Sequence, residues 1–215
     1  MKIANIKNSI VDNLKVCNGG SYHSNLLENQ TNKVSLSSFS PSSFDKGAGK
    51  LKIVLWYFVN AIFVRASWNP FMGFKVFLLK LFGAKIGKGF VLKNNVIIKS
   101  PWNLSIGNNV WIGENVWIDN LDKVIIGNDV CISQGVLLLT GNHDYTRSTF
   151  DYRNAPITIE DGAWVGAKTI VCPGVIVHSH AILTVGSVAT KDLEAYGIYQ
   201  GNPSVKIRER KIINK

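Results

Sequence analysis

Histidines are scarce in this chain of 215 residues, and one of them stands where a regular pattern breaks. The four histidines are His23, His143, His178 and His180. A neutral imidazole is the natural base for an alcohol near neutral pH, because its unperturbed pKa of about 6.5 lies close to that range. His143 lies in the polar segment TGNHDY, and we predict it to be a general base rather than a histidine satisfied in a surface turn. Asn142 or Asp144 could orient its ring through the second nitrogen.

A six-residue repeat occupies the chain from residue 86 onward and must position this histidine. Fourteen of fifteen repeat positions are Ile, Leu or Val, and these positions are Ile86, Leu92, Ile98, Ile106, Ile112, Ile118, Ile126, Ile132, Leu138, Ile159, Val165, Val171, Val177, Leu183 and Ala189. Neither a helix nor an alternating strand has this period, whereas a hexapeptide solenoid does. Three hexads close one triangular coil, with the aliphatic side chains inside. We therefore predict an all-β parallel β-helix over residues 84–203.

Two local features refine this prediction. Glycine often follows the aliphatic residue, as at Gly87 and Gly113, and is expected to supply unusual backbone angles at the corners. The first three coils begin at residues 86, 106 and 126, so each carries two extra residues. The repeat breaks once, and we predict an excursion loop over residues 146–158. Loops of that length in a compact domain are usually functional.

The two ends of the chain differ from the repeat. Residues 1–48 are rich in Asn, Ser and Gly and predict a mobile arm. Residues 49–83 predict two amphipathic helices separated at Asn69-Pro70, which either cap the β-helix or anchor it at a membrane surface. Residues 204–215 predict a basic C-terminal tail. The three cysteines form neither a zinc motif nor a disulfide framework, which indicates a reducing compartment.

The location of the charges excludes some partners. The formal net charge is +10, with +8 in residues 1–85, −2 in residues 86–205 and +4 in residues 206–215. A nucleic-acid surface would place basic residues on the folded core, so no nucleic-acid partner is expected. No apolar stretch is long enough to span a bilayer, and no secretory signal is evident. We expect a cytoplasmic protein, with peripheral association at the inner face of the membrane as a further expectation.

Several motifs together resemble one family of enzymes. They are LLKLFGAKIGK, SPWNLSIGNNVWIGENVWI, CISQGVLLLTGNHDY, APITIEDGAWVGA, CPGVIV and GNPSVKIRER, within residues 50–210. In these segments the chain resembles the hexapeptide-repeat acyltransferases, in particular the acetyltransferases of colanic-acid and related exopolysaccharide biosynthesis. The resemblance implies a left-handed parallel β-helix. It also implies a homotrimer with active sites between neighbouring prisms.

The same resemblance implies roles for individual residues. The acetyl donor would be acetyl-coenzyme A (acetyl-CoA), bound along a groove between two prisms. The matching cofactor-binding positions are Ala167, Val185, Thr190, Lys191 and Arg208. The backbone N–H of Ala167 would hold the oxyanion, and Lys191 and Arg208 would meet phosphates. Trp164 would pack beside the pantetheine arm or line the subunit interface. One departure is Val205, where relatives usually carry a basic residue.

The acceptor side is less specific. Asp119 and Asn120 could bind sugar hydroxyls or could form a polar corner. The predicted loop adds residues suited to contact a sugar or a sugar phosphate, namely Arg147, Asp151, Tyr152 and Arg153. The resulting hypothesis is transfer of an acetyl group to a hydroxyl of a glycan or lipid-linked sugar precursor, with His143 as the base.

Three alternatives stay open. An N-acetyltransferase of an amino sugar would use the same residues. A γ-type carbonic-anhydrase-like enzyme would bind zinc through three histidines, which draws attention to His143, His178 and His180, although the spacing of the last two departs from that family. We therefore predict no metal ligands. A non-catalytic solenoid scaffold would need neither the loop nor the segment Thr190-Lys191-Asp192.

Overall fold

The computed structural model describes residues 33–40 and 44–213. The chain divides into two units, of which the first comprises Met1–Phe39 and Tyr145–Phe150. Within the described part of that unit, a single 3-10 turn, η2 (Leu36–Ser38), follows Ser35, whose N–H donates to Ser148 O at 2.8 Å. The predicted mobile arm, residues 1–48, lies mostly outside the described residues and stays a prediction. The second unit, Ser40–Asp144 and Asp151–Lys215, holds all the other elements.

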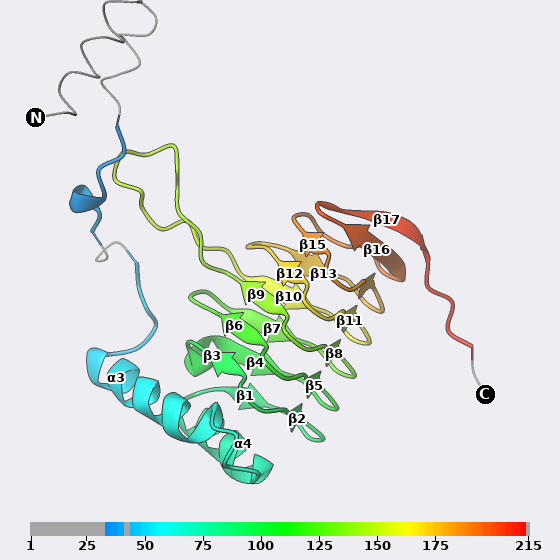
Figure 1. Cartoon of the computed structure of the whole chain (residues 1–215), viewed down its shortest axis with the longest axis horizontal. Coiled ribbons are helices and arrows are strands. Elements are labelled where there is room, and N and C mark those ends of the chain that lie inside the picture. Colours follow the sequence, from blue (N-terminus) through cyan, green and yellow to red (C-terminus); the bar gives the residue numbers. More distant parts are fainter. Residues whose placement is uncertain (1–32, 41–43, 214–215) are drawn as a thin grey trace, which may run out of the picture. The chain divides into compact units, whose positions relative to one another are not determined.

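Three parallel sheets form the faces of the β-helix (Figure 1). Sheet A contains, from its first coil to its last, β1 (Lys85–Ile86), β4 (Leu104–Ile106), β7 (Val124–Ile126), β10 (Ile157–Ile159) and β13 (Ile176–Val177). Sheet B contains β2 (Val91–Leu92), β5 (Trp111–Ile112), β8 (Cys131–Ile132), β11 (Trp164–Val165), β14 (Ile182–Leu183), β16 (Gly197–Gly201) and β17 (Ser204–Glu209). Sheet C contains β3 (Ile97–Ile98), β6 (Trp117–Asp119), β9 (Leu137–Leu139), β12 (Ile170–Val171) and β15 (Val188–Ala189).

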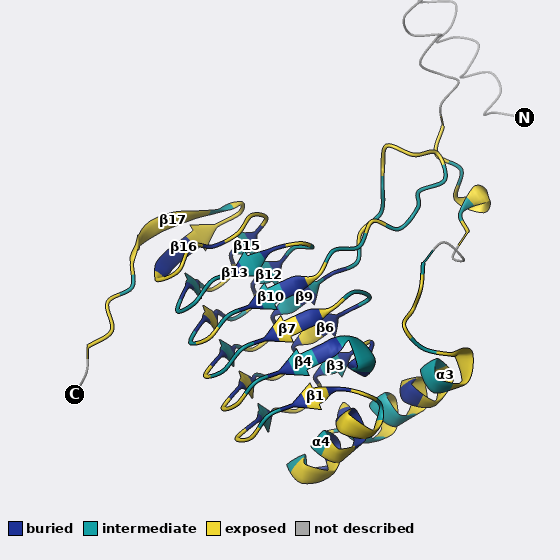
Figure 2. Cartoon of the chain, turned by 180° about the vertical axis from the view of Figure 1, so that it is seen from behind, coloured by how far each residue is buried: buried dark blue, intermediate teal, exposed yellow. Residues whose placement is uncertain are grey.

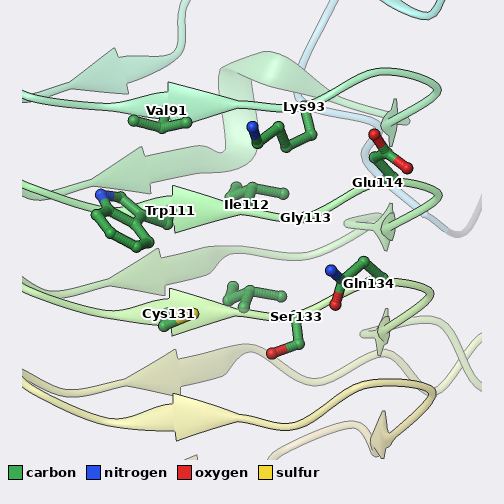
Figure 3. A pocket seen from close by; sticks show the side chains of 10 residues that line it. Val91, Lys93, Trp111, Ile112, Gly113, Glu114, Cys131, Ser133 and Gln134 are labelled. Atoms are coloured by element: carbon green, nitrogen blue, oxygen red, sulfur yellow. The ribbon is translucent and has the colours of Figure 1, made fainter.

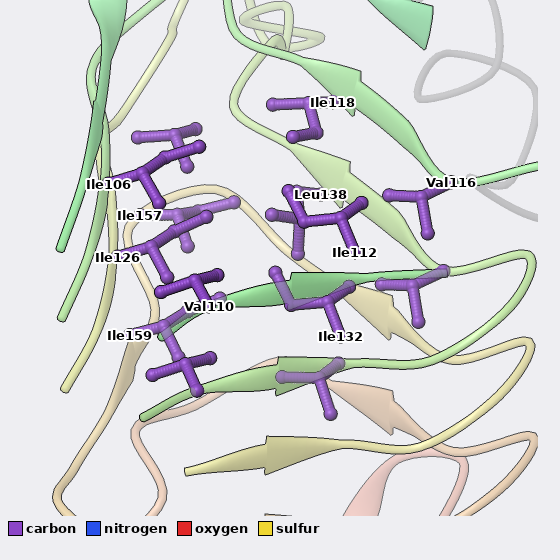
Figure 4. Packing of buried hydrophobic residues seen from close by; sticks show 14 of the residues in the cluster. Ile106, Val110, Ile112, Val116, Ile118, Ile126, Ile132, Leu138, Ile157 and Ile159 are labelled. Carbon is purple, nitrogen blue, oxygen red and sulfur yellow. The ribbon is translucent and has the colours of Figure 1, made fainter. Parts of the chain in front are cut away.

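The register confirms the sequence repeat. Ile86 pairs with Ile106 and Ile106 with Ile126, a spacing of 20 residues, whereas Ile159 pairs with Val177, a spacing of 18. The inward aliphatic side chains stack coil upon coil and are buried (Figure 4). Each fully buried Ile, Leu or Val contributes about 1.5–3 kcal/mol relative to exposure, so the aliphatic column holds the coils together. The predicted parallel β-helix with a preceding helical segment is thus confirmed.

The glycines after the aliphatic residues serve a different purpose from the predicted one. A Cβ on Gly113 would lie 2.7 Å from Gln134 N and 2.8 Å from Ser133 C, both in the next coil. These glycines therefore permit close approach between coils. The left-handed backbone falls instead on the corners, for example at Asn109 (φ 56°) and Asp129 (φ 55°). Asn109 Nδ2 donates to Asp129 Oδ1 at 2.9 Å, so a ladder of polar side chains links these corners.

The one excursion from the β-helix has different bounds from those predicted. The chain leaves sheet C after Leu139 and returns at Ile157, so residues 140–156 are looped out rather than 146–158. The prediction was wrong at both ends: residues 140–144 already belong to the excursion, and β10 begins two residues before the aliphatic Ile159. Ile157 and Thr158 pair with Val124 and Ile125 of β7. Strand β10 therefore repeats the longer sheet A strand of the coil before it.

Two helices cover the first coil. Helix α3 (Lys50–Val59) continues into a π-helical turn, η4 (Asn60–Val64), and α4 (Met72–Leu81) follows a break that contains Asn69 and Pro70, as predicted. Trp56 Nε1 donates to Ile98 O at 2.9 Å and fastens α3 to β3. The opposite faces of both helices are exposed (Figure 2). Among the described residues, no helix combines the length and apolarity needed to cross a membrane.

The other end of the β-helix is closed by a hairpin. Strand β16 pairs in parallel with β14, and β17 pairs with β16 in the antiparallel direction. The predicted tail over residues 204–215 is therefore wrong for Ser204–Glu209, which form an edge strand. Gly201 makes this possible, because its φ of +105° lies in the left-handed region and turns the chain back on itself.

Candidate active site

The excursion begins and ends as a two-stranded stem. Its two arms, residues 140–144 and 151–155, exchange backbone hydrogen bonds. The bonds run from Ala155 N to Thr140 O (3.1 Å), from Arg153 N to Asn142 O (2.8 Å) and from Asp144 N to Asp151 O (2.8 Å). His143 and Tyr152 face each other across this stem as an antiparallel bridge. The predicted base is therefore placed by a hydrogen-bonded ribbon and not by an irregular loop.

Tyr152 is the aromatic partner of His143. The two ring centroids lie 4.7 Å apart, and the ring planes are 28° apart, which is a stacked arrangement. Asn142 Oδ1 accepts a hydrogen bond from the backbone N–H of His143 at 2.8 Å, so it stabilises the local turn. Orientation of the ring by Asn142 or Asp144 stays a prediction. The sequence predicts Tyr152 only as a sugar contact, because a ring stack across the stem forms only when the two arms are paired.

Asp119 lies at the base of the stem and is buried. Its Oδ1 forms an ion pair with Lys99 Nζ at 2.7 Å. A Cβ on Gly141 would lie 3.5 Å from Asp119 Oδ2, which shows how closely the outgoing arm passes this carboxylate. The structure thus brings Asp119 next to the segment that carries His143, as a substrate-binding role would require.

Asn120, the other predicted acceptor contact, is not available to a substrate. The residue is 0% exposed. Its Oδ1 accepts from Ser100 N at 2.9 Å, and its Nδ2 donates to Ser100 O at 2.6 Å. Because both its oxygen and its nitrogen bond to the backbone of Ser100, the carboxamide of Asn120 links two successive coils. The predicted role of Asn120 as a sugar ligand was therefore wrong.

Three of the predicted cofactor residues share one groove on sheet B. Trp164, Ala167 and Val185 line a cavity of about 360 Å³. Trp164 is 45% exposed, and its Nε1 donates to Ser133 Oγ at 2.9 Å, which fixes the indole against the previous coil. The lining is mainly apolar and presents backbone at Gly166 and Ala167. Such a surface suits a narrow, mostly uncharged chain that is held by backbone groups.

A second cavity of about 320 Å³ continues this groove toward the first coil (Figure 3). Ser133 and Gln134 line both cavities. Trp111 and Cys131 line this second cavity. Cys131 pairs with Trp111 on one side and with Trp164 on the other, so the three residues are neighbours on successive strands of sheet B. Burial raises the pKa of the Cys131 thiol, against a hydrogen bond with Ser133 that lowers it, so the thiol stays protonated near neutral pH. No motif in the sequence points to this part of the groove.

The remaining predicted cofactor residues lie near the closing hairpin. Thr190 and Lys191 are exposed just after β15, and Arg208 is exposed on β17 opposite Ile198. Lys206, the neighbour of the unusual Val205, contacts Glu194 at 2.7 Å and Glu209 at 2.6 Å. The bond to Glu194, followed by that to Glu209, raises the pKa of Lys206 above its ordinary value. Lys206 is thus engaged in two ion pairs, whereas Lys191 and Arg208 are placed at the surface where phosphates could meet them.

The two groups of residues occupy different parts of the prism. The stem with His143 leaves the β-helix between β9 of sheet C and β10 of sheet A. The groove with Trp164 and Ala167 lies on sheet B, and its lining residues all come from β-strands and corners of the β-helix. Within one chain, His143 and the groove residues Trp164, Ala167 and Val185 therefore line separate surfaces, whereas Thr190 and Lys191 follow β15 of sheet C, at the same corner of the prism as the stem.

The other described histidines have their own structural partners. His178 Nδ1 lies 3.1 Å from Glu160 Oε1, and the ring of His180 stacks on Tyr196 with centroids 4.8 Å apart. Both histidines lie at a corner of the fifth coil, while His143 lies on the stem that follows the third. Within residues 33–40 and 44–213, no cluster of three or more His, Cys, Asp or Glu is placed to hold a metal ion. The three histidines of the zinc alternative do not converge.

Together, the hexapeptide β-helix and its histidine-bearing excursion define an acyltransferase architecture, and comparisons with known proteins agree. No protein-family model matches the chain. WcaF of Escherichia coli K12, named as an acetyltransferase of colanic acid biosynthesis, is 37% identical over 177 residues, which are 81% of this chain and 96% of WcaF. The galactoside O-acetyltransferase of the same organism is 30% identical over 135 residues, which are 61% of this chain and 66% of that protein. The chain therefore belongs to the hexapeptide-repeat acetyltransferases.

A solved structure adds evidence on the fold. The hexapeptide-repeat acetyltransferase of Vibrio cholerae, complexed with acetyl-coenzyme A, superposes with a TM-score of 0.70 and 19% identity. The match covers 79% of this chain and 93% of that chain. These relatives and neighbours confirm the predicted class, a left-handed parallel β-helix of the acetyltransferase type.

Proposed function

We propose that this protein transfers an acetyl group from acetyl-CoA to a hydroxyl of a sugar in surface polysaccharide biosynthesis, with His143 as general base. The observation that carries the proposal is the stem that presents His143, stacked on Tyr152, beside the carboxylate of Asp119. The names of two relatives, WcaF and the galactoside O-acetyltransferase, support a sugar acceptor. The bound acetyl-CoA of the Vibrio cholerae structure supports the donor.

The chemistry follows from the residues. An imidazole nitrogen of His143 takes the proton of the sugar hydroxyl as the oxygen forms its bond to the thioester carbonyl carbon. The backbone N–H of Ala167 donates to the oxyanion that develops. The carbon–sulfur bond then breaks, and the leaving thiolate takes the proton back from the imidazolium. Tyr152 holds the ring in place during both proton transfers.

A homotrimer would complete this site, since one chain keeps the two halves apart. In the proposed assembly, the excursion of one subunit faces the sheet B groove of the next. Large side chains face outward on sheets B and C, where Trp111 is 61% and Trp117 is 46% exposed. Exposed tryptophans in register with apolar neighbours on adjacent coils are typical of a surface that a second subunit covers.

The helical segment supports a position at the membrane face. Its outward side carries large apolar residues, and we call these residues the outer apolar face. They are Leu51, Val54, Leu55, Tyr57, Phe58, Ile62, Trp68, Phe71, Phe74, Phe77 and Leu81, all exposed. Residues 50–83 contain no Asp or Glu and carry three exposed cations, Lys50, Arg65 and Lys80. The other two are turned inward, because Lys75 is buried and Lys52 lies over the ring of Trp102. An apolar face flanked by cations alone fits an anionic lipid surface.

The catalytic proposal is tested by following release of free thiol from acetyl-CoA with a panel of glycosides and amino sugars. We expect His143→Ala to lower kcat by about a hundredfold or more, because general base catalysis is worth that much. The matched control is His178→Ala, which removes a histidine held by Glu160 on the fifth coil. Full activity of His143→Ala, or loss of activity in both variants alike, would overturn the role of His143. Transfer to amines alone would replace the O-acetyl proposal with the N-acetyl one.

Subunit complementation tests the shared site. His143→Ala and Ala167→Trp each damage a different half, so each variant alone should be inactive. Mixed trimers formed by co-expression should regain activity at the interfaces that pair two intact halves. A monomer by sedimentation, or no recovery in mixed trimers that are shown to form, would refute the shared site.

Membrane association is tested by co-sedimentation of the full chain with vesicles. We expect binding to phosphatidylglycerol vesicles, weakened by salt, and little binding to phosphatidylcholine. The double variant Leu55→Glu, Phe58→Glu should release the protein. Ile125→Glu, which places the same charge on an exposed apolar site of sheet A, is the matched control. Equal binding of the double variant and the control would exclude the outer apolar face as the contact.

A further inference from the structure

A small cavity lies directly beside the stack of His143 and Tyr152. Its volume is about 190 Å³. Segments far apart in the sequence meet around it, and its polar and aromatic lining consists of Lys46, Lys99, Ser100, Trp102 and Tyr152. Tyr152 therefore contributes both to this cavity and, through the ring contact of 4.7 Å, to the placement of His143. A group bound here would lie next to the proposed base.

The cavity is fixed by contacts that leave little freedom to its walls. Trp102 Nε1 donates to Lys46 O at 2.7 Å, which ties the segment before α3 to the second coil. Lys52 Nζ lies 5.3 Å from the centroid of the Trp102 ring, a cation–π contact. Lys99 is held by Asp119 at 2.7 Å. Three lysines are thus placed around one indole at the base of the stem.

The charges around the cavity do not balance. Lys46, Lys52 and Lys99 face it or its indole wall, and Asp119 neutralises only Lys99. Asp45, which precedes Lys46 in the chain, does not line the cavity and accepts a hydrogen bond from the backbone N–H of Gly47 at 2.8 Å. An excess of ammonium groups beside a hydroxyl, Ser100, and a tyrosine is a surface that recognises an anion. Phosphate oxygens accept from Lys strongly, whereas a neutral sugar would gain little from this charge.

We propose that this cavity, hereafter the lysine cavity, binds a phosphate group attached to the acceptor sugar, so that the acceptor is a sugar phosphate or a sugar diphosphate ester. The inference rests on the proposed acetyl transfer and names its acceptor class. Lys46 and Lys99 hold the phosphate, and the sugar that carries it extends toward His143. The outer apolar face begins at Leu51 on the helix that follows Lys46, so the phosphate could belong to a soluble ester or to a lipid carrier.

The test compares galactose with galactose 1-phosphate as acceptors. Charge-assisted hydrogen bonds predict that the phosphate lowers the KM by about tenfold or more in the wild type. Lys46→Met should abolish this difference by raising the KM for galactose 1-phosphate to the KM for galactose. Lys99→Arg, which keeps the charge opposite Asp119, should retain it. The matched control is Lys88→Met, at an exposed corner of the same first coil. An equal KM for the two acceptors in the wild type would overturn the proposal, while acetyl transfer itself would stand.

Binding is measured separately, so that a failure of catalysis does not obscure the result. Calorimetry of the full chain with galactose 1-phosphate should show binding that Lys46→Met weakens by about tenfold and Lys88→Met does not. Absence of binding, or equal binding by both variants, would refute the lysine cavity whatever the activity. A polyprenyl-diphosphate-linked galactose in detergent supplies the lipid arm. A KM for the lipid-linked acceptor that is lower still than the KM for the soluble ester would assign the phosphate to a lipid carrier.

Discussion

His143 and Tyr152 stack across the two arms of one hydrogen-bonded stem, with ring centroids 4.7 Å apart. The contact ties the orientation of an imidazole to a residue nine positions later in the chain. It also joins the proposed base to the lysine cavity, because Tyr152 is part of the lining of that cavity.

Replacement of Tyr152 should reveal a positioning role. We expect Tyr152→Ala to lower kcat by up to about tenfold, because an aromatic pair is worth about 0.5–1.5 kcal/mol beyond its area burial. The KM for acetyl-CoA should not change, since the tyrosine does not line the sheet B groove. Tyr152→Phe keeps the ring and should restore kcat. A loss of kcat in the Phe variant equal to that in the Ala variant would point to the hydroxyl instead.

Filling the sheet B groove should weaken binding of the donor. Val185 is exposed and lines the groove with Trp164 and Ala167, so Val185→Trp places an indole in the proposed path of the pantetheine arm. We expect the KM for acetyl-CoA to rise by about tenfold or more, with thermal unfolding unchanged, because loss of about 1.4 kcal/mol of binding suffices. Ile125→Trp, on exposed sheet A, is the control. The groove assignment fails if the two variants have the same KM.

Replacement by alanine should change the stability of the fold in opposite directions at two glycines. Gly113→Ala would force a Cβ to within 2.8 Å of the backbone of the next coil, and we expect it to destabilise the fold by about 1–3 kcal/mol. Gly73→Ala, in α4, meets no atom within 4 Å and should stabilise by about 0.5 kcal/mol through reduced entropy of the unfolded chain. Urea unfolding of both variants measures the contrast. Equal stability of the two would mean that the coils can separate to accept a methyl group.

Asp161 should make the free energy of unfolding depend on pH in the acidic range. The backbone N–H of Asn128 donates to Asp161 Oδ1 at 2.7 Å, and this bond, with those from the Asn128 side chain, holds the pKa of Asp161 below its ordinary value. A carboxyl whose pKa is lowered by folding stabilises the fold above its unfolded pKa of about 3.9 and stops doing so as the pH falls through the folded value. Asp161→Asn should therefore be less stable than the wild type at pH 7, and the two should converge as the pH falls below the pKa of Asp161 in the folded protein.

Unfolding of both proteins in urea from pH 2.5 to pH 7 measures this difference, with Glu114→Gln as a charge-removal control at an exposed corner. A difference in the free energy of unfolding between the wild type and Asp161→Asn that does not vary with pH would contradict the assignment.

The fold was predictable because its repeat is local. Each inward position, such as Ile132 or Val165, is read from the chain six residues at a time, and burial follows from the narrow prism. What the spacing did not reveal was the reason for its glycines. Gly113 and Gly107 meet backbone that comes twenty or more residues later, and only stacking of the coils brings the two together.

The site was predictable only where one residue carries the chemistry. His143 and Asp119 stand out by type and position, and both lie at the excursion. Asn120 is equally polar, but it bonds to Ser100 of the preceding coil, and this contact arises only when the coils stack. The lysine cavity could not be predicted, since Lys46, Lys99 and Trp102 meet only when the segment before α3 folds back on the second coil.

The hairpin of β16 and β17 has a consequence for the solubility of the chain. The last coil of a parallel β-helix has strand edges on which further strands, including those of other molecules, could add. Strand β17 runs against the direction of the other strands and presents Lys206, Arg208 and Glu209 at the open edge. A strand of another molecule would meet an edge strand of the opposite direction and charged side chains there. Strand β17 therefore disfavours the addition of further strands to sheet B at this end of the β-helix.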